Sequence, residues 1–374
     1  MKLVIAGGGT GGHLFPGIAV AEEFLSRDKS NEVLFVGTER GIESRAVPAA
    51  GYRLEVISAA GIRGKGMLSQ LKGAAMMLYG YAQSRKILKD FSPDMVLGVG
   101  GYASLPIVLA SRGMQIPRFI HEQNAIPGQT NRLLAKFANQ VFITLEESGS
   151  YFPKDSTLLT GNPLRRQILN SIATGDSCAI ESKKNEADLS TQITQQSFNL
   201  LVFGGSQGAH AINSAMIAAL PLLKDCGLNL NITHQTGDKD LAEVCAAYRA
   251  AEVQADVTAF ISGMAEEYAK ADLVICRAGA TTIAETTACG KACLFIPFPH
   301  AVDDHQRKNA EALLKKDACF MMLERELTGI SLAESIQTLA QDRILVRNTG
   351  DLAFSLAKLD AARIIVDEML KKMN

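Results

Sequence analysis

The sequence has no long hydrophobic run. No segment approaches the ~18 to 20 apolar residues of a membrane-spanning helix. Only four apolar residues separate Met1-Lys2 from the first glycines, which is too few for the hydrophobic region of a signal peptide. We therefore predict a protein that is made and kept in the cytoplasm.

The sequence also lacks an excess of positive or negative charge, and its cysteines do not have the spacing of a metal site. The formal net charge is −1, which argues against a nucleic-acid partner held by a basic field. The seven cysteines are scattered, and the closest pair, Cys289 and Cys293, has no second pair or nearby histidine to complete a metal site. We expect buried, reduced thiols and no metal.

What the sequence does contain is typical of a globular α/β protein. Hydrophobic residues make up 47% and charged residues 21% of 374 residues, a length that favours two domains. Short runs of Val, Ile, Leu and Phe alternate with helical patterns, as expected for parallel strands buried on both faces. We predict two doubly wound parallel-sheet domains. The expected strands are 2–6, 32–36, 53–57, 94–98, 117–121 and 140–144, then 199–203, 229–234, 256–260, 272–276 and 292–296.

The domain boundary is expected near residue 165. We assign 1–164 to an N-terminal domain and 165–349 to a C-terminal domain. The stretch 170–197 is crowded with Ser, Thr, Gln, Lys and Glu and is predicted to be an exposed excursion with little packed structure. A last helix, within 350–374, could pack on either domain.

A strand, a glycine-rich loop and a helix start occur twice. The first loop is Gly7–His13 and the second is Gly204–His210. Such loops let backbone amides approach an anion, and the following helix adds its positive end. Two anion-binding edges would suit an enzyme that joins two phosphate-bearing substrates. The spacing of Gly7, Gly9 and Gly12 also fits a dinucleotide site, but only Glu39 is available as the ribose acid, so this signal is weak.

Polar side chains follow the other strands of the first half. His13 lies at a helix start, which disfavours its charged form and suits a general base, although a local hydrogen-bonding role is also open. A third glycine loop, 98–103, is either a ligand loop or tight packing. The polar run His121–Asn124 ends a strand, where we expect it to face a ligand crevice, with a structural role as a helix N-cap or a hydrogen-bond acceptor open for Glu122.

The second half has a similar set. Ser206 and Gln207 lie where a helix start can bind phosphate. Glu285 lies in the helix after a glycine turn, where a carboxylate can accept two ribose hydroxyls. The segment 297–306 holds two His and two Asp without the helical spacing of two His ligands, so we interpret it as a sugar-hydroxyl site.

Taken together, these motifs resemble the MurG family of cell-wall glycosyltransferases. GGGTGGH, GVGGYAS, HEQN, GNPLR, GGSQGA, CRAGATTIAE and PFPHAVDDHQ occur in the family's order and span residues 7–306. The resemblance implies a GT-B fold, with two Rossmann-like domains facing a cleft. It implies inverting transfer of N-acetylglucosamine (GlcNAc) from UDP-GlcNAc to the C4 hydroxyl of the muramoyl sugar of undecaprenyl-pyrophosphoryl-MurNAc-pentapeptide (lipid I), which gives lipid II. It implies no metal-dependent DxD motif and no cofactor.

The resemblance also assigns residues. His13 and Glu122 would be the acid–base candidates, and the choice between them stays open. Gly9, Gly100, Gly101 and Tyr102 would be candidates for the acceptor pyrophosphate. The donor contacts would be Thr10, Gly11, Gly12, Asn124, Arg165, Ser206, Ile261, Ala280, Thr281, Thr282, Ile283, Ala284, Glu285 and Gln306.

An acceptor with a polyprenyl tail gives a meaning to the stretch 67–79. Its apolar residues are flanked by Arg63, Lys65, Lys72, Arg85, Lys86 and Lys89. We expect a peripheral protein that docks on anionic lipid at the cytoplasmic side of the inner membrane, unless this stretch is simply an amphipathic core helix. A UDP-sugar epimerase, an NAD-dependent oxidoreductase and a non-catalytic UDP-GlcNAc sensor are the competing interpretations.

Overall fold

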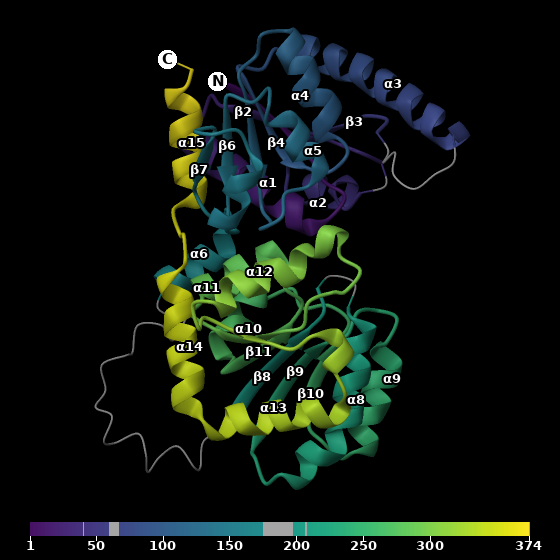
Figure 1. The fold of residues 1–374 in the computed structure, drawn as a ribbon, viewed down its shortest axis with the longest axis vertical. Helices are drawn as coiled ribbons and strands as arrows, with labels where there is room; N and C mark the ends of the chain where they lie inside the picture. The colour runs from purple at the N-terminus through teal and green to yellow at the C-terminus, as the bar shows by residue number, and fades with distance from the viewer. Residues whose placement is uncertain (40, 60–66, 175–196, 206–207, 374) are drawn as a thin grey trace. The chain divides into compact units, whose positions relative to one another are not determined.

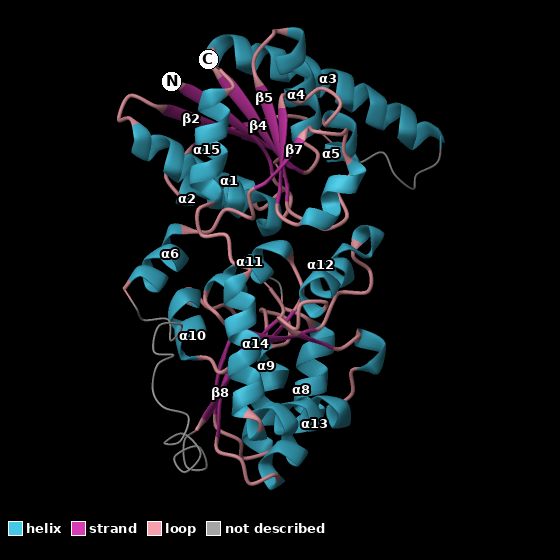
Figure 2. Cartoon of the chain, turned by 60° about the vertical axis from the view of Figure 1, so that its left-hand side comes forward, coloured by secondary structure: helices cyan, strands magenta, loops and turns pink. Residues whose placement is uncertain are grey.

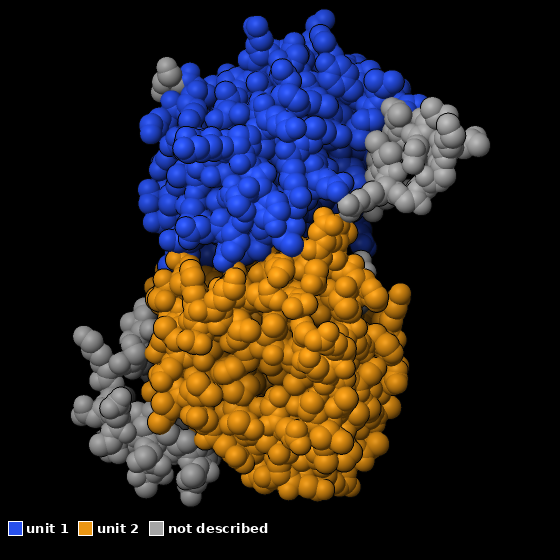
Figure 3. Space-filling model, in the orientation of Figure 1, with its two compact units in different colours: residues 1–166, 358–374 blue, residues 167–357 orange. Residues whose placement is uncertain are grey.

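The computed structural model describes residues 1–39, 41–59, 67–174, 197–205 and 208–373, and the side chains of residues 67–74 are outside that description. The chain forms two compact units (Figure 3). Unit 1 is Met1–Arg166 with Lys358–Asn374, and unit 2 is Gln167–Ala357.

Unit 1 is built on a parallel sheet of seven strands. The strand order is β3-β2-β1-β4-β5-β6-β7, with all neighbouring strands parallel. The strands are β1 (Lys2–Gly7), β2 (Glu32–Gly37), β3 (Arg53–Val56), β4 (Met95–Gly100), β5 (Arg118–Glu122), β6 (Gln140–Ile143) and β7 (Thr157–Leu159). Residues 2–7 of β1 are apolar or glycine after Lys2, and all but Lys2 are buried, as a central parallel strand requires.

Helices cover both faces of this sheet (Figure 2). One face carries α1 (Gly11–Arg27), α2 (Glu43–Ala49) and the C-terminal α15 (Ala361–Lys371), which share a core with Leu3 and Ile5. The other face carries α3 (Met67–Phe91), α4 (Ser104–Gly113) and α5 (Gln129–Leu134), packed on Val4 and Val96.

Unit 2 repeats the architecture with a six-stranded parallel sheet. Its order is β10-β9-β8-β11-β12-β13. The strands are β8 (Phe198–Phe203), β9 (Leu230–Gln235), β10 (Ala255–Thr258), β11 (Leu273–Cys276), β12 (Ala292–Phe295) and β13 (Phe320–Met321). On one face lie α8 (His210–Asp225), α9 (Leu241–Ala250) and α13 (Gly329–Gln341), and on the other α10 (Met264–Lys270), α11 (Ala280–Ala288) and α12 (His305–Leu314).

The strand order places the glycine loops. In both sheets the order reverses at the first strand, so β1 lies beside β4, and β8 lies beside β11 (Figure 1). Ligands of open parallel sheets bind beyond the carboxyl ends of the strands at such a reversal point. Each unit therefore has two loops at its own ligand-binding edge.

Several boundaries differ from the sequence-based expectation. The single helix expected within 350–374 is two helices, α14 (Arg343–Ser355) in unit 2 and α15 in unit 1. The start of the polar excursion 170–197 is packed, because α6 (Arg166–Ala173) buries Ile168 against unit 2, whereas residues 175–196 lie outside the described part. Four of the cysteines are buried, but Cys226 and Cys245 are half-exposed.

Candidate active site

The two glycine loops of unit 1 pack directly on each other. Gly9 and Gly101 have φ of 87° and 81°, which non-glycine residues rarely adopt. The amide of Gly8 donates to the Gly100 carbonyl at 3.3 Å, and a side chain on Gly101 would lie 2.5 Å from the Gly8 carbonyl oxygen. Two of the three pyrophosphate-candidate glycines, Gly100 and Gly101, therefore sit against the loop that holds the third.

A buried carboxylate, which the sequence analysis missed, holds the first loop. The Gly9 amide donates to Oε2 of Glu43 at 2.7 Å, and Oε1 accepts from the Thr38 amide and hydroxyl, both at 2.9 Å. Glu43 is 1% exposed, and side chains at Gly8 or Gly41 would overlap its carboxylate. Because the chain's own carboxylate takes the Gly9 N–H, this amide is not offered to a substrate anion, which counts against both Gly9 as a pyrophosphate contact and a dinucleotide site at Gly7–Gly12. No sequence pattern singled out Glu43, since one acid at a helix start is common.

His13 is a titratable side chain that lies against the second of these loops. It is the third residue of α1, is half-buried, and its ring packs against Gly100. Its Nδ1 lies 2.8 Å from Oε1 of Gln123. Helix α1 begins at Gly11, two residues before the expected start.

The expectation that His121–Asn124 faces a ligand crevice is wrong for the first three residues. His121, Glu122 and Gln123 are each at most 1% exposed, and only Asn124 is half-exposed. Hydrogen bonds within unit 1 satisfy the three buried side chains, which is how a sheet edge can hold polar groups without a ligand. Burial also lowers the pKa of His121 to about 4, so its ring is neutral.

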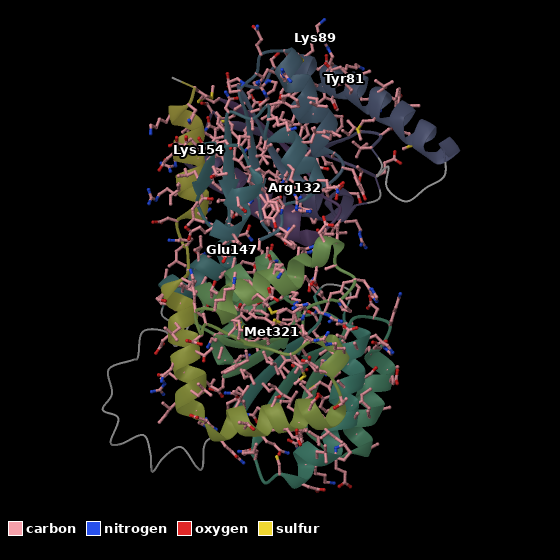
Figure 4. The ribbon with its side chains drawn as sticks, viewed as in Figure 1. Tyr81, Lys89, Arg132, Glu147, Lys154 and Met321 are labelled. Carbon is pink, nitrogen blue, oxygen red and sulfur yellow. The ribbon has the colours of Figure 1, made fainter. Side chains whose placement is uncertain are left out.

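Glu122 holds the loop that carries Asn124. Its Oε1 accepts from the Asn124 amide at 2.9 Å, and its Oε2 accepts from the Gly128 amide at 3.2 Å and from Nδ2 of Asn131 at 2.8 Å. Arg132, labelled in Figure 4, donates to the Pro127 carbonyl of the same loop at 2.9 Å. Both carboxylate oxygens are therefore occupied by donors of this chain.

In unit 2 the second glycine loop is tied to a neighbouring segment. Nε2 of Gln235 donates to the Gly205 carbonyl at 2.8 Å, and its Oε1 accepts from the Ile261 amide at 2.9 Å. Gln235 is 1% exposed and was not singled out in the sequence. Gln235 therefore connects two segments that carry expected donor contacts: the glycine loop, which holds Ser206, and the segment that holds Ile261. Ser206 and Gln207 themselves lie outside the described residues.

The remaining donor candidates lie on α11 and the start of α12. Residues 280–285 form the first turns of α11, with Glu285 3% exposed. Oε1 of Gln306 accepts from the Phe298 amide at 3.0 Å, so its Nε2 is directed away from that bond. Arg277 supports the same segment, because its Nη1 donates to the carbonyls of Ile296 and Pro297 at 3.1 and 3.3 Å and its guanidinium pairs with Glu324.

The predicted residues therefore fall into one set on each unit. At the sheet edge of unit 1 lie Thr10–His13, Gly100–Tyr102, Asn124 and Arg165, whose guanidinium stacks on Phe15. In unit 2 lie Ile261, 280–285 and Gln306. Among the residues with described positions, no group of three or more His, Cys, Asp or Glu is arranged to hold a metal ion.

Comparison with known proteins identifies the fold and its relatives. Residues 3–143 match the glycosyltransferase family 28 N-terminal domain, and residues 199–360 match the family's C-terminal domain. A structure of MurG from Acinetobacter baumannii aligns with a TM-score of 0.77 at 30% identity, covering 99% of both chains. A UDP-GlcNAc 2-epimerase from Neisseria meningitidis aligns with a TM-score of 0.66 at 14% identity over 99% of this chain and all of that chain, which shows a shared fold alone.

Two sequence relatives match over the full length. One from Pelobacter propionicus is 67% identical over 100% of both chains, and one from Geobacter sulfurreducens is 64% identical over 99% of this chain and 98% of its own. Both are named UDP-N-acetylglucosamine–N-acetylmuramyl-(pentapeptide) pyrophosphoryl-undecaprenol N-acetylglucosamine transferase. With two parallel-sheet Rossmann-like units and these relatives, the chain belongs to the MurG family of glycosyltransferase family 28.

Proposed function

We propose that this enzyme transfers GlcNAc from UDP-GlcNAc to the C4 hydroxyl of the MurNAc sugar of lipid I, giving lipid II for peptidoglycan synthesis. The observation that carries the proposal is the 67% identity, over the entire chain, to a relative named for this reaction. The donor is UDP-GlcNAc and the acceptor is lipid I.

We assign the general base to His13. A base must reach the acceptor hydroxyl with an unprotonated nitrogen. Nδ1 of His13 is occupied by Gln123, which leaves Nε2 for the substrate. Nε2 takes the proton of the C4 hydroxyl as its oxygen attacks C1 of GlcNAc. The bond from C1 to the UDP oxygen breaks, UDP leaves with the electron pair, and the configuration at C1 inverts.

Glu122 has a different role in this proposal. Its oxygens accept hydrogen bonds from Asn124, Gly128 and Asn131, and the side chain is 1% exposed. A carboxylate in this position shapes the loop that presents Asn124 to the donor. Proton removal needs a lone pair that faces the substrate, which His13 offers and Glu122 does not.

The donor nucleotide is assigned to unit 2. Glu285 accepts the ribose hydroxyls, and Ser206 and the helix start at α8 bind the phosphates. Nε2 of Gln306 donates to a hydroxyl of the sugar, since its Oε1 already accepts from Phe298. Thr10, Gly11, Gly12, Asn124 and Arg165 complete the donor contacts from unit 1.

We also infer that the enzyme binds peripherally at the cytoplasmic face of the membrane, because its proposed acceptor is a lipid. No described helix is long and apolar enough to cross a membrane. Leu78 and Tyr79 on α3 are 73% and 61% exposed, and Arg85, Lys86 and Lys89 on the same helix are exposed as well. Exposed apolar groups next to basic ones favour docking on anionic lipid.

The test is an assay of UDP release from UDP-GlcNAc, with and without a lipid I analogue. We expect release only with the analogue, together with a product that carries one additional GlcNAc in β linkage. Release of UDP at the same rate without the acceptor, or formation of the 2-epimer of the sugar, would overturn the proposal.

A further inference from the structure

We propose that Gln123 is a positioning residue that fixes the tautomer of His13, holding the proton on Nδ1 and keeping the lone pair on Nε2. This inference rests on the proposed role of His13 as base. Its test is chosen so that the two ideas fail separately.

The Val99 carbonyl fixes the orientation of the Gln123 side-chain amide. Nε2 of Gln123 lies 2.9 Å from the carbonyl oxygen of Val99, on β4. A backbone carbonyl only accepts, so the group facing it must be the amide NH₂. Turning the amide over would place its oxygen against the Val99 oxygen. The Val99 carbonyl therefore directs Oε1 of Gln123 toward His13.

The neutral ring of His121 accepts the other proton of the Gln123 amide. Nε2 of Gln123 lies 3.0 Å from Nδ1 of His121, and Nε2 of His121 lies 3.3 Å from the Gly161 carbonyl. The Gly161 carbonyl accepts a proton from Nε2 of His121, which leaves Nδ1 of that ring as an acceptor. Because His121 is fully buried and its pKa is lowered to about 4, this acceptor persists across the neutral pH range.

Both protons of the Gln123 amide are therefore committed, to Val99 and to His121. Its Oε1 can only accept, and Nδ1 of His13, at 2.8 Å, must donate. His121 and Glu122 are the last two residues of β5 and point to opposite sides of the sheet, and Gln123, directly after the strand, contacts the His121 ring. The hydrogen bonds that run from His121 through Gln123 to His13 thus lie on one side of the sheet. The Glu122 carboxylate, which holds the loop of Asn124, lies on the other.

Gln123 is an uncharged partner for His13, unlike the aspartate of a His–Asp pair. In a His–Asp pair the carboxylate stabilises the imidazolium as well as the tautomer. An amide oxygen orients the ring without adding a negative charge. Gln123 therefore keeps Nε2 available as a base while adding no ionic partner for the protonated ring.

The experiment records ring-nitrogen NMR spectra of protein labelled with ¹⁵N at its six histidines. Signals of His13 are assigned by their loss in His13→Ala. In the wild-type protein we expect the neutral ring to carry its proton on Nδ1. In Gln123→Met we expect a shift toward protonation at Nε2 and an unchanged KM for UDP-GlcNAc. We expect kcat to fall by about 10- to 100-fold, by analogy with the loss of a partner that orients a metal-binding histidine.

Gln140→Met is the matched control. Gln140 is also a buried glutamine of this sheet, on β6, and its amide donates to the Ser156 carbonyl at 2.9 Å, away from both histidines. We expect the wild-type tautomer and kcat in this variant. An equal loss in Gln140→Met would show that the effect of Gln123→Met is a general one of core damage, and would overturn the assignment.

Gln123→Glu keeps the proposal testable if Gln123→Met does not fold. The second oxygen of the glutamate faces the Val99 carbonyl, so it must carry a proton and donate there, and the first oxygen stays opposite Nδ1 of His13. We therefore expect the proton of His13 to stay on Nδ1. A wild-type His13 spectrum in Gln123→Met, or loss of the Nδ1 proton in Gln123→Glu, would overturn the role of Gln123. A changed tautomer with unchanged kcat would instead leave that role standing and remove His13 as the base.

Discussion

The sequence offers both His13 and Glu122 as acid–base candidates, and their hydrogen bonds in the structure distinguish the two. We predict that His13→Ala lowers kcat by about 10² to 10⁴-fold, the usual cost of losing a general base. The affinity for UDP-GlcNAc should be nearly unchanged, because the nucleotide is assigned to unit 2. Single-turnover kinetics, with donor binding measured separately by calorimetry, check both parts.

Glu122→Gln is the comparison for that prediction. The amide keeps one oxygen but places an NH₂ group against the donors at Asn124 or at Gly128 and Asn131. We expect weaker donor binding from a displaced loop, while the acidic limb of the pH–rate profile stays. If His13→Ala keeps near-normal kcat and Glu122→Gln abolishes the acidic limb, Glu122 is the base.

Glu285 gives a prediction for the other unit. A carboxylate that accepts ribose hydroxyls makes charge-assisted hydrogen bonds, so Glu285→Ala should weaken UDP binding by about 2–3 kcal/mol. The measurement is calorimetric titration with UDP and with UDP-GlcNAc. Glu243→Ala, at an exposed position on α9 of the same unit, is the control and should bind both as the wild type does. Unchanged UDP affinity in Glu285→Ala would remove the ribose assignment.

At the scale of elements, α3 combines a packed part and an exposed part. Tyr81 packs against the core formed with α4, whereas Leu78 and Tyr79 are exposed (Figure 4 labels Tyr81 and Lys89). We predict that Leu78→Ser with Tyr79→Ser weakens binding to anionic vesicles by at least about tenfold, since burying each side chain in the interface contributes on the order of 1–2 kcal/mol. Vesicle co-sedimentation measures this.

Two further variants separate apolar docking from charge attraction. Lys86→Glu with Lys89→Glu should make the remaining binding less sensitive to salt, because screening acts on the charged component. Ile330→Ser, at a 63% exposed apolar position on α13, is the control for surface apolarity in general. Equal binding by the Leu78–Tyr79 variant and the wild type would show that α3 is not the docking face.

The elements that sequence predicted well are those whose burial is uniform. Apart from Lys2 and Asn199 near their starts, the central strands β1, β4, β8 and β11 consist of apolar residues and glycine, and burial on both faces leaves few alternatives for such runs. The short elements β7 and β13, with three and two residues, have no periodicity to detect. They form because a neighbouring strand offers its free edge.

The candidate site was predicted in its loops but not in its supports. Glycine loops and a histidine at a helix start have local patterns. Glu43, Gln123 and Gln235 each bind at least one partner that is 26 to 110 residues away, such as Ile261 for Gln235 and His13 for Gln123. The error at His121–Asn124 has another cause: polarity was interpreted as exposure, although partners within unit 1, some only 2 to 9 residues away, satisfy these side chains.

For the whole molecule, buried histidines link stability to pH. Burial lowers the pKa of His121 in unit 1 and of His234 in unit 2 to about 4, from an ordinary value of 6.5. The folded form therefore holds these rings neutral, while the unfolded chain binds a proton on each below pH 6.5. Stability is complete above that pH and is lost as the pH falls toward 4, by up to about 3 kcal/mol for each histidine.

His234 allows this linkage to be tested away from the catalytic set. Its Nε2 donates to Oδ1 of Asn213 at 3.0 Å, and its Nδ1 accepts from the Tyr248 hydroxyl at 3.2 Å, so the neutral ring is fully used. We predict that His234→Gln, which cannot titrate, reduces the slope of the unfolding free energy of unit 2 against pH by about one proton between pH 4 and 6.5. Denaturant unfolding followed by circular dichroism at several pH values measures the slope. His300→Gln, at an exposed position, should leave it unchanged, and an identical slope in His234→Gln and the wild type would mean that His234 is not held neutral by the fold.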